Sequence, residues 1–136
     1  MPFVIDASVT ASRLLPDETD ARAEQAYALL DTDSAVMPGL WWFELRNALV
    51  INERRGRLSE ADTTLFLNSV ARLPVRLDRD PDGTTVLMLA RRHRLTVYDA
   101  SYLELALRRG LPLASLDGEL RQAATACGVA LLGENT

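Results

Sequence analysis

Three aspartates in this sequence occupy equivalent positions, each at the end of a short apolar run. Asp6 comes after FVI, Asp99 after TVY and Asp117 after LASL. Each run reads as a short strand that is followed by a helical stretch. In a parallel α/β sheet such strand ends lie on one edge, where ligands of this architecture bind. We therefore expect the three carboxylates to converge, although they are far apart in the chain.

Each aspartate taken alone also fits a purely structural role. Aspartate is a favoured N-cap and its charge suits the positive end of a helix. Ser101 and Glu104 have the spacing of a capping box, which would leave Asp99 free for another role. The capping interpretation and the functional one both stay open for the individual residues.

A fourth acid, Glu44, lies within a predicted helix and not at its end. It shares a helical stripe with Asn47 and Ile51. A carboxylate in a largely apolar stripe is unfavourable to bury without a partner. Either Arg46 or Arg22 supplies that partner through a salt bridge, or Glu44 joins the three aspartates.

Four converging carboxylates would repel one another, and their natural complement is a hard divalent cation. Mg²⁺ and Mn²⁺ prefer oxygen ligands, and Mg²⁺ sites of this kind typically act on phosphates. There the ion activates a water and neutralises charge on the leaving oxygen. Hydrolysis of a phosphodiester is therefore the leading reaction.

The composition excludes several other chemistries. The sequence contains no lysine, so a P-loop lysine and a Schiff-base lysine are absent. One cysteine, Cys127, and one histidine, His93, can form neither an internal disulfide nor a structural zinc site within the chain. All fifteen basic residues are arginines, which suit phosphate contacts. The net charge of −4 predicts that such contacts are local and do not form a broad basic face.

The elements that must position these residues alternate between short apolar runs and amphipathic stretches. This alternation predicts one α/β domain over residues 1–136 with a mostly parallel central sheet. The expected strands are 3–5, 35–37, 74–77, 95–97, 113–115 and 129–132. The expected helices are 20–30, 40–55, 59–71, 84–92, 100–109 and 118–126, the third of which begins with Ser59 and Asp62 in a capping arrangement.

The sequence shows no sign of export or membrane insertion. The N-terminal residues have no basic region before their short apolar stretch, and no apolar run approaches the ~20 residues of a membrane helix. We expect a cytoplasmic protein with no membrane partner.

Three blocks of the sequence resemble a known family. VIDAS, FELRNAL and VYDASYLELALRRGLPLASLDGEL are similar, in order and spacing, to the blocks of PIN-domain ribonucleases, specifically the VapC-type toxins of toxin–antitoxin pairs. The resemblance covers nearly the whole chain. It implies a PIN-like three-layer α/β/α domain that cleaves RNA with Mg²⁺ or Mn²⁺ as cofactor.

The resemblance also implies roles for individual residues. In-line attack of an activated water on an RNA phosphate is the implied mechanism, with Asp99 or Asp117 positioning the water and with no covalent protein intermediate. Asn47 either orients Glu44 or serves helix packing. The implied metal-binding and catalytic acids are Asp6, Glu44, Asp99 and Asp117; Ser115 fits the family's Ser or Thr position, and Ser8, Arg22 and Asn47 are candidate substrate contacts.

The implied partners are an RNA substrate, a small cognate antitoxin and a second copy of the chain in a homodimer. Two other functions stay open. A phosphatase with Asp6 as nucleophile would usually carry a second aspartate two residues later, where Ser8 stands. A non-catalytic PIN-like binding module would be favoured if one of the four acids were replaced by a neutral residue, and none is.

Overall fold

Four parallel strands form the centre of the fold. The computed structural model describes residues 1–133, and the last three residues of the predicted domain, 134–136, lie outside that range. The strands are β1 (Phe3–Ile5), β2 (Ala35–Pro38), β3 (Val75–Asp78) and β4 (Leu113–Ala114), in the order β3-β2-β1-β4. All three pairings are parallel, which confirms the predicted α/β class.

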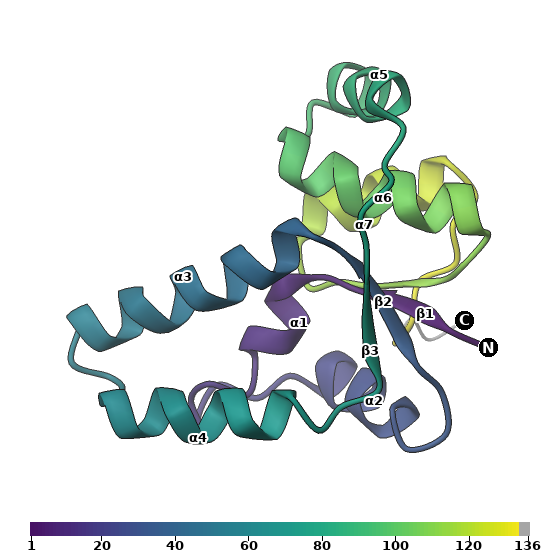
Figure 1. Ribbon diagram of the computed structural model, residues 1–136. Helices are drawn as coiled ribbons and strands as arrows, with labels where there is room; N and C mark the ends of the chain where they lie inside the picture. The colour runs from purple at the N-terminus through teal and green to yellow at the C-terminus, as the bar shows by residue number, and fades with distance from the viewer. Residues whose placement is uncertain (134–136) are drawn as a thin grey trace.

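Helices cover both faces of this sheet. α5, α6 and α7 lie on one side, and α1, α2 and α4 lie on the other, so the fold has three layers (Figure 1). α3 extends away from the sheet and α4 returns toward it (Figure 1). The helices are α1 (Ala7–Ala11), α2 (Ala21–Leu29), α3 (Leu40–Arg54), α4 (Glu60–Val70), α5 (Gly83–His93), α6 (Val97–Arg109) and α7 (Gly118–Ala126).

Side-chain caps explain where several helices begin. Ser59 and Asp62 form the predicted capping box at the start of α4, each bonding the other's backbone N–H. Asp6, Asp82 and Asp117 cap α1, α5 and α7 respectively through their carboxylates. Helix starts therefore follow the polar residues that end the preceding strands or loops.

Two predicted strands are wrong. Residues 95–97 form no strand, because Thr96 accepts the N–H of Asp99 and so caps α6, which begins at Val97. Residues 129–132 contribute a single bridge, Leu113 to Leu131, at the β4 edge. The capping box expected between Ser101 and Glu104 is also absent, because Ser101 donates to the carbonyl of Val97 within the helix. The short helix α1 was not predicted.

The core lies around β1 and α6. All of β1 is buried, as expected for a short strand that is covered on both faces. α6 packs against β1, β2 and β4, and its side chains Tyr102, Leu103 and Leu105 are almost completely inaccessible. α6 thus places its first turn, with Asp99, beside the strand ends.

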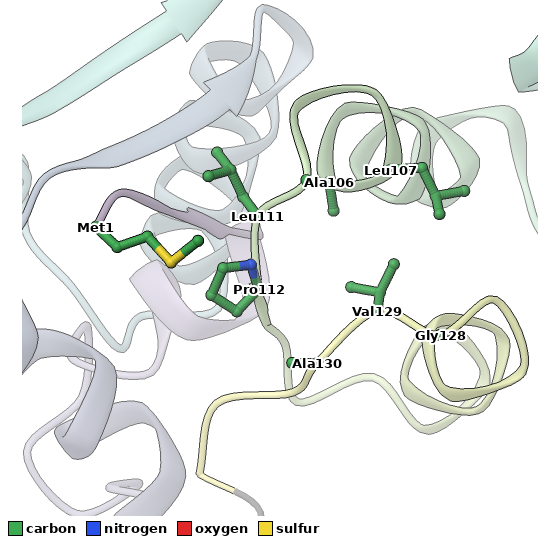
Figure 2. A pocket seen from close by; sticks show the side chains of 9 residues that line it. Met1, Ala106, Leu107, Leu111, Pro112, Gly128, Val129 and Ala130 are labelled. Carbon is green, nitrogen blue, oxygen red and sulfur yellow. The ribbon is translucent and has the colours of Figure 1, made fainter.

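An apolar pocket lies at the opposite, amino-terminal edge of the sheet. Met1 precedes β1 and Pro112 precedes β4, and both line a hollow of about 330 Å³ with Leu107 and Val129 (Figure 2). Its lining carries no charged side chain. Chemistry that needs polar side chains must therefore take place elsewhere, and the carboxyl edge holds them.

Within residues 1–133, no helix is both long enough and apolar enough to cross a membrane.

Candidate active site

Asp6 stands at the end of β1, and its side chain is only 4% exposed. The carboxylate accepts hydrogen bonds from Ser8 Oγ and the backbone N–H of Val9 on one oxygen. Its other oxygen accepts a hydrogen bond from Ser115 Oγ. Three donors therefore hold the buried carboxylate in one orientation.

The two serines also join the loops that follow β1 and β4. Ser8 Oγ accepts the N–H of Leu116 at 3.0 Å, and Ser115 Oγ accepts the N–H of Asp117 at 3.0 Å. Each hydroxyl thus donates to Asp6 and accepts from the β4–α7 loop. The position of Asp117 relative to Asp6 is consequently set by two hydroxyl groups.

Behind Asp6 lies a buried polar network that the sequence interpretation did not identify. Thr10 Oγ1 accepts the indole N–H of Trp41 at 2.9 Å, and the carbonyl of Thr10 accepts the hydroxyl of Tyr27 at 2.8 Å. These bonds tie α1 to α2 and α3. The spacing of single polar residues in apolar helices is the only trace of this network in the sequence.

Glu44 on α3 reaches the same region and is partnered by Tyr102 of α6. The tyrosine hydroxyl donates to Glu44 Oε1 at 2.7 Å. Neither salt bridge considered for Glu44 forms, because Arg46 stacks over the Trp42 ring and Arg22 pairs with Asp20. The sequence interpretation missed Tyr102, although it lies three residues after Asp99 on α6.

Asp99 lies in the first turn of α6 and not at the end of a strand. Its backbone N–H is bonded by Thr96, so Asp99 does not cap the helix. Its own carboxylate accepts no hydrogen bond within residues 1–133. Burial, followed by the charges of Asp117 and Asp6, raises the pKa of Asp99 to about 6.

Asp117 lies between β4 and α7 and does cap a helix. Its Oδ2 accepts the N–H of Leu120 at 2.9 Å. One turn further along α7, Arg121 donates to the carbonyl of Ser115 at 2.9 Å. The capping role and membership of the acidic group therefore coexist in Asp117, as they do in Asp6.

The four acids Asp6, Glu44, Asp99 and Asp117 influence one another electrostatically. Burial raises the pKa of Asp6, with a smaller rise from Asp117, while hydrogen bonds from Ser115 and Ser8 lower it. Burial also raises the pKa of Glu44, against the Tyr102 hydrogen bond, and the charges of Asp99 and Asp6 add to the rise. Like charges raise a carboxyl pKa only at short range, so the four acids share one region.

The four acids have no basic partner in the part of the chain that the structure describes. Within residues 1–133, none of the four acids forms a salt bridge, whereas Asp20, Glu24 and Asp78 elsewhere each pair with an arginine. The region is therefore a site of uncompensated negative charge. A buried carboxylate without such a partner is energetically unfavourable unless hydrogen bonds, a proton or a bound cation compensates its charge.

The donor set fits Mg²⁺ or Mn²⁺. The four acids would offer an ion only carboxylate oxygens, the ligands that these hard ions prefer. Glu44 Oε2, Asp117 Oδ1 and both oxygens of Asp99 accept no hydrogen bond from residues 1–133 and are available to an ion. In the described part of the chain, no three acidic, histidine or cysteine side chains already converge on one ion-binding point. An ion would therefore have to draw these side chains together.

The three expected substrate contacts lie in different surroundings. Ser8 is engaged by Asp6 and Leu116, as described above. Asn47 is exposed on α3, and its side chain makes no hydrogen bond within residues 1–133. Arg22 lies at the start of α2, where its guanidinium donates to Asp20 at 3.0 Å and 3.2 Å.

Comparison with known proteins agrees with this architecture. Residues 3–126 match the sequence model of the PIN domain. The chain is 32% identical over 129 residues to ribonuclease VapC3 of Pyrobaculum aerophilum, which covers 90% of this chain and 94% of that protein.

Solved structures show the same fold. The crystal structure of PAE2754 from Pyrobaculum aerophilum superimposes with a TM-score of 0.68 and 28% identity, covering 90% of this chain and 87% of that one. FitAcB from Neisseria gonorrhoeae gives a TM-score of 0.58 at 18% identity, with coverage of 98% and 97%. The crystal structure of VapC20 of Mycobacterium tuberculosis, a sarcin-ricin loop cleaving toxin, gives a TM-score of 0.60 at 15% identity. The match covers 89% of this chain and 94% of that one. The two latter likenesses bear on fold alone.

Because the family model spans most of the sequence and a relative matches along nearly its full length, this chain belongs to the PIN-domain family.

Proposed function

We propose that this PIN domain is a divalent-metal-dependent endoribonuclease that acts as the toxin of a toxin–antitoxin pair. The observation that carries the proposal is the group of four acids at the carboxyl edge of the parallel sheet, which has no basic partner within residues 1–133. The 32% identity to a ribonuclease supports RNA as the substrate. The place of action is then the cytoplasm, where that RNA is found.

Asp6, Glu44, Asp99 and Asp117 are the proposed holders of Mg²⁺ or Mn²⁺. A bound ion would activate a water for in-line attack and neutralise charge on the phosphate. The protein's own side chains provide the orientation: Ser8 and Ser115 hold Asp6, and the Tyr102 hydroxyl holds Glu44. We assign the positioning of the attacking water to Asp99 or Asp117, because each has a carboxylate oxygen that accepts no hydrogen bond from residues 1–133.

The proposed partners are a small antitoxin and a second copy of this chain. Exposed apolar side chains support an association of this kind. A groove of about 450 Å³ has a mainly apolar lining that includes the exposed Leu65 and the half-buried Phe66. Further exposed apolar side chains lie at the start of α3, on α5 and at the start of α6: Trp42, Phe43, Leu87, Met88, Val97 and Tyr98. Exposed apolar patches are typical of interaction sites.

Purified wild-type protein should cleave RNA in the presence of Mg²⁺ or Mn²⁺, and the cleavage should stop when EDTA is added. The Asp6→Asn substitution should abolish cleavage. Asparagine caps a helix about as well as aspartate, so the substitution removes the charge and keeps the cap of α1. Asp82→Asn is the matched control, since Asp82 caps α5 away from the four acids. Cleavage assays with end-labelled RNA measure both variants. Full activity of Asp6→Asn, or activity that survives thorough chelation, would contradict the proposal.

A further inference from the structure

A polar pocket lies next to Asp117, at the β4 edge of the sheet. It lies between α7 and the start of α2 and has a volume of about 370 Å³. Its lining consists of Arg22, Gly118, Arg121, Gln122, Thr125 and Leu131. Gly118 follows Asp117 directly, so one end of the pocket adjoins the fourth acid.

The lining of this pocket has the chemistry of an anion site. Residues 1–133 contribute two guanidinium groups, a glutamine and a threonine to it, and no acidic side chain. Arg121 uses Nη1 for the carbonyl of Ser115 and forms no salt bridge within residues 1–133. Arg22 is held by Asp20 through Nε and Nη2, which fixes its guanidinium at the rim. Both arginines are partly exposed, so a ligand can reach them.

The pocket also has a direction relative to the site. Gly118, Arg121 and Thr125 lie at spacings of three and four residues, on one face of α7. From Gly118 to Thr125 the helix rises about 10 Å, at roughly 1.5 Å per residue. The pocket thus leads away from Asp117 along α7. Arg121 is tied through Ser115 to Asp6, since Ser115 donates its hydroxyl to that carboxylate.

We propose that Arg22 and Arg121 bind a backbone phosphate of the RNA next to the phosphate that is cleaved. The inference rests on the proposed ribonuclease function and names a substrate contact for it. A guanidinium is planar and presents paired N–H donors that match phosphate oxygens. A strand whose scissile phosphate lies at the four acids can continue past Asp117, where the two arginines of this pocket carry positive charge. It accounts for local RNA contact in a chain of net charge −4.

The test measures RNA binding without cleavage. Asp6→Asn protein in EDTA is titrated against a fluorescein-labelled twelve-nucleotide single-stranded RNA of mixed sequence, by fluorescence anisotropy at several salt concentrations. Each phosphate contact to single-stranded nucleic acid contributes about 0.7 to the slope of log affinity against log salt. In that background the double variant Arg22→Gln/Arg121→Gln should lower the slope by about 0.7, the contribution of one phosphate, and each single substitution should lower it by part of that amount.

The controls separate a lost contact from a damaged fold. Arg72→Gln makes the same charge change on an exposed arginine that precedes β3, at the opposite edge of the sheet, and should leave the slope unchanged. Arg121→Lys keeps the charge without the planar fork, so it should weaken binding while the slope stays near that of the parent. Thermal melting establishes that each variant is folded before its slope is compared.

Failure of this inference differs from failure of the proposed function. If the wild type cleaves RNA and folded Arg22→Gln and Arg121→Gln variants keep the parent's slope, the pocket is not a phosphate site, although the ribonuclease function stands. The inference is likewise overturned if polyglutamate, an acidic peptide, binds the protein and those substitutions weaken the binding of the peptide but not the binding of RNA. If the wild type cleaves no RNA in Mg²⁺ or Mn²⁺, the proposed function itself fails.

Discussion

Asp99 differs from the other two aspartates of the site because it caps no helix. Thr96 provides the cap of α6, and the carboxylate of Asp99 is left beside the charges of Asp117 and Asp6. Asp6 and Asp117 contribute to helix starts as well as to the acidic group. Substitution of Asp99 therefore tests the cost of burying its charge and of placing it beside other acids, without the loss of a cap.

In metal-free protein, Asp99→Asn should raise the melting temperature at pH 7.5 and leave it nearly unchanged at pH 3.5. The folded pKa of Asp99 is about 6, above its ordinary value of 3.8. The folded state thus binds more protons than the unfolded chain between these values, and stability falls as pH rises through that window. The penalty is fully present above pH 6, where the neutral asparagine removes it.

Thermal denaturation followed by circular dichroism in EDTA measures both pH values. Asp82→Asn is again the control. It makes the same chemical change at an exposed aspartate, the N-cap of α5. If Asp99→Asn melts at a lower temperature than the wild type at pH 7.5, the Asp99 carboxylate stabilises the fold and the expectation is wrong.

At the scale of elements, the start of α6 decides where Asp99 stands. The Thr96 hydroxyl oxygen accepts the N–H of Asp99 at 3.0 Å and ends the preceding loop. α6 is also the helix that packs across β1, β2 and β4, so its position is set by the core. A threonine on the surface and a buried helix face together bring Asp99 to the strand ends.

Thr96→Ala should lower the free energy of unfolding by about 1 kcal/mol, because alanine cannot accept the N–H at the start of α6. Thr96→Ser should restore most of this loss, since serine caps at least as well as threonine. Urea denaturation of the three proteins measures the difference. An alanine variant as stable as the wild type would show that the cap of α6 contributes nothing.

The whole molecule combines one acidic site with exposed apolar surface on several helices. Trp42 at the start of α3, Met88 on α5 and Tyr98 at the start of α6 are exposed. Such surface is suited to partners, whereas the four acids lie where α3 and the start of α6 meet the carboxyl ends of β1 and β4. The proposed toxin role places both in one system: an RNA-cleaving site, and surfaces through which an antitoxin and a second copy bind.

Expression of the wild type alone in a bacterial host should arrest growth, whereas Asp99→Asn at equal abundance should be tolerated. The substitution removes one of the proposed metal-binding carboxylates, so RNA cleavage is lost. Growth curves after induction, with immunoblots for protein amount, make the comparison. Equal arrest by both proteins would show that cleavage at this site is not the cause of toxicity.

Local patterns were sufficient to predict most elements from the sequence. Apolar runs such as FVI and the helical spacing of residues 40–55 arise from short-range geometry, which a sequence displays directly. The same patterns placed Asp6 and Asp117 correctly after β1 and β4. They failed at residues 95–97, where TVY has strand composition although Thr96 caps a helix. Propensity over three residues is weak compared with one capping bond and a buried helix.

The partners within the site were decided by the tertiary structure alone. Tyr102 meets Glu44 across 58 residues, and Ser115 meets Asp6 across 109. No local spacing encodes such pairs, because they depend on which strands are neighbours and on how α3 and α6 pack. The four carboxylates were candidates from their sequence positions and from the family resemblance. What holds them, and which arginines lie beside them, follows only from the parallel order of the sheet, which brings β1 and β4 together.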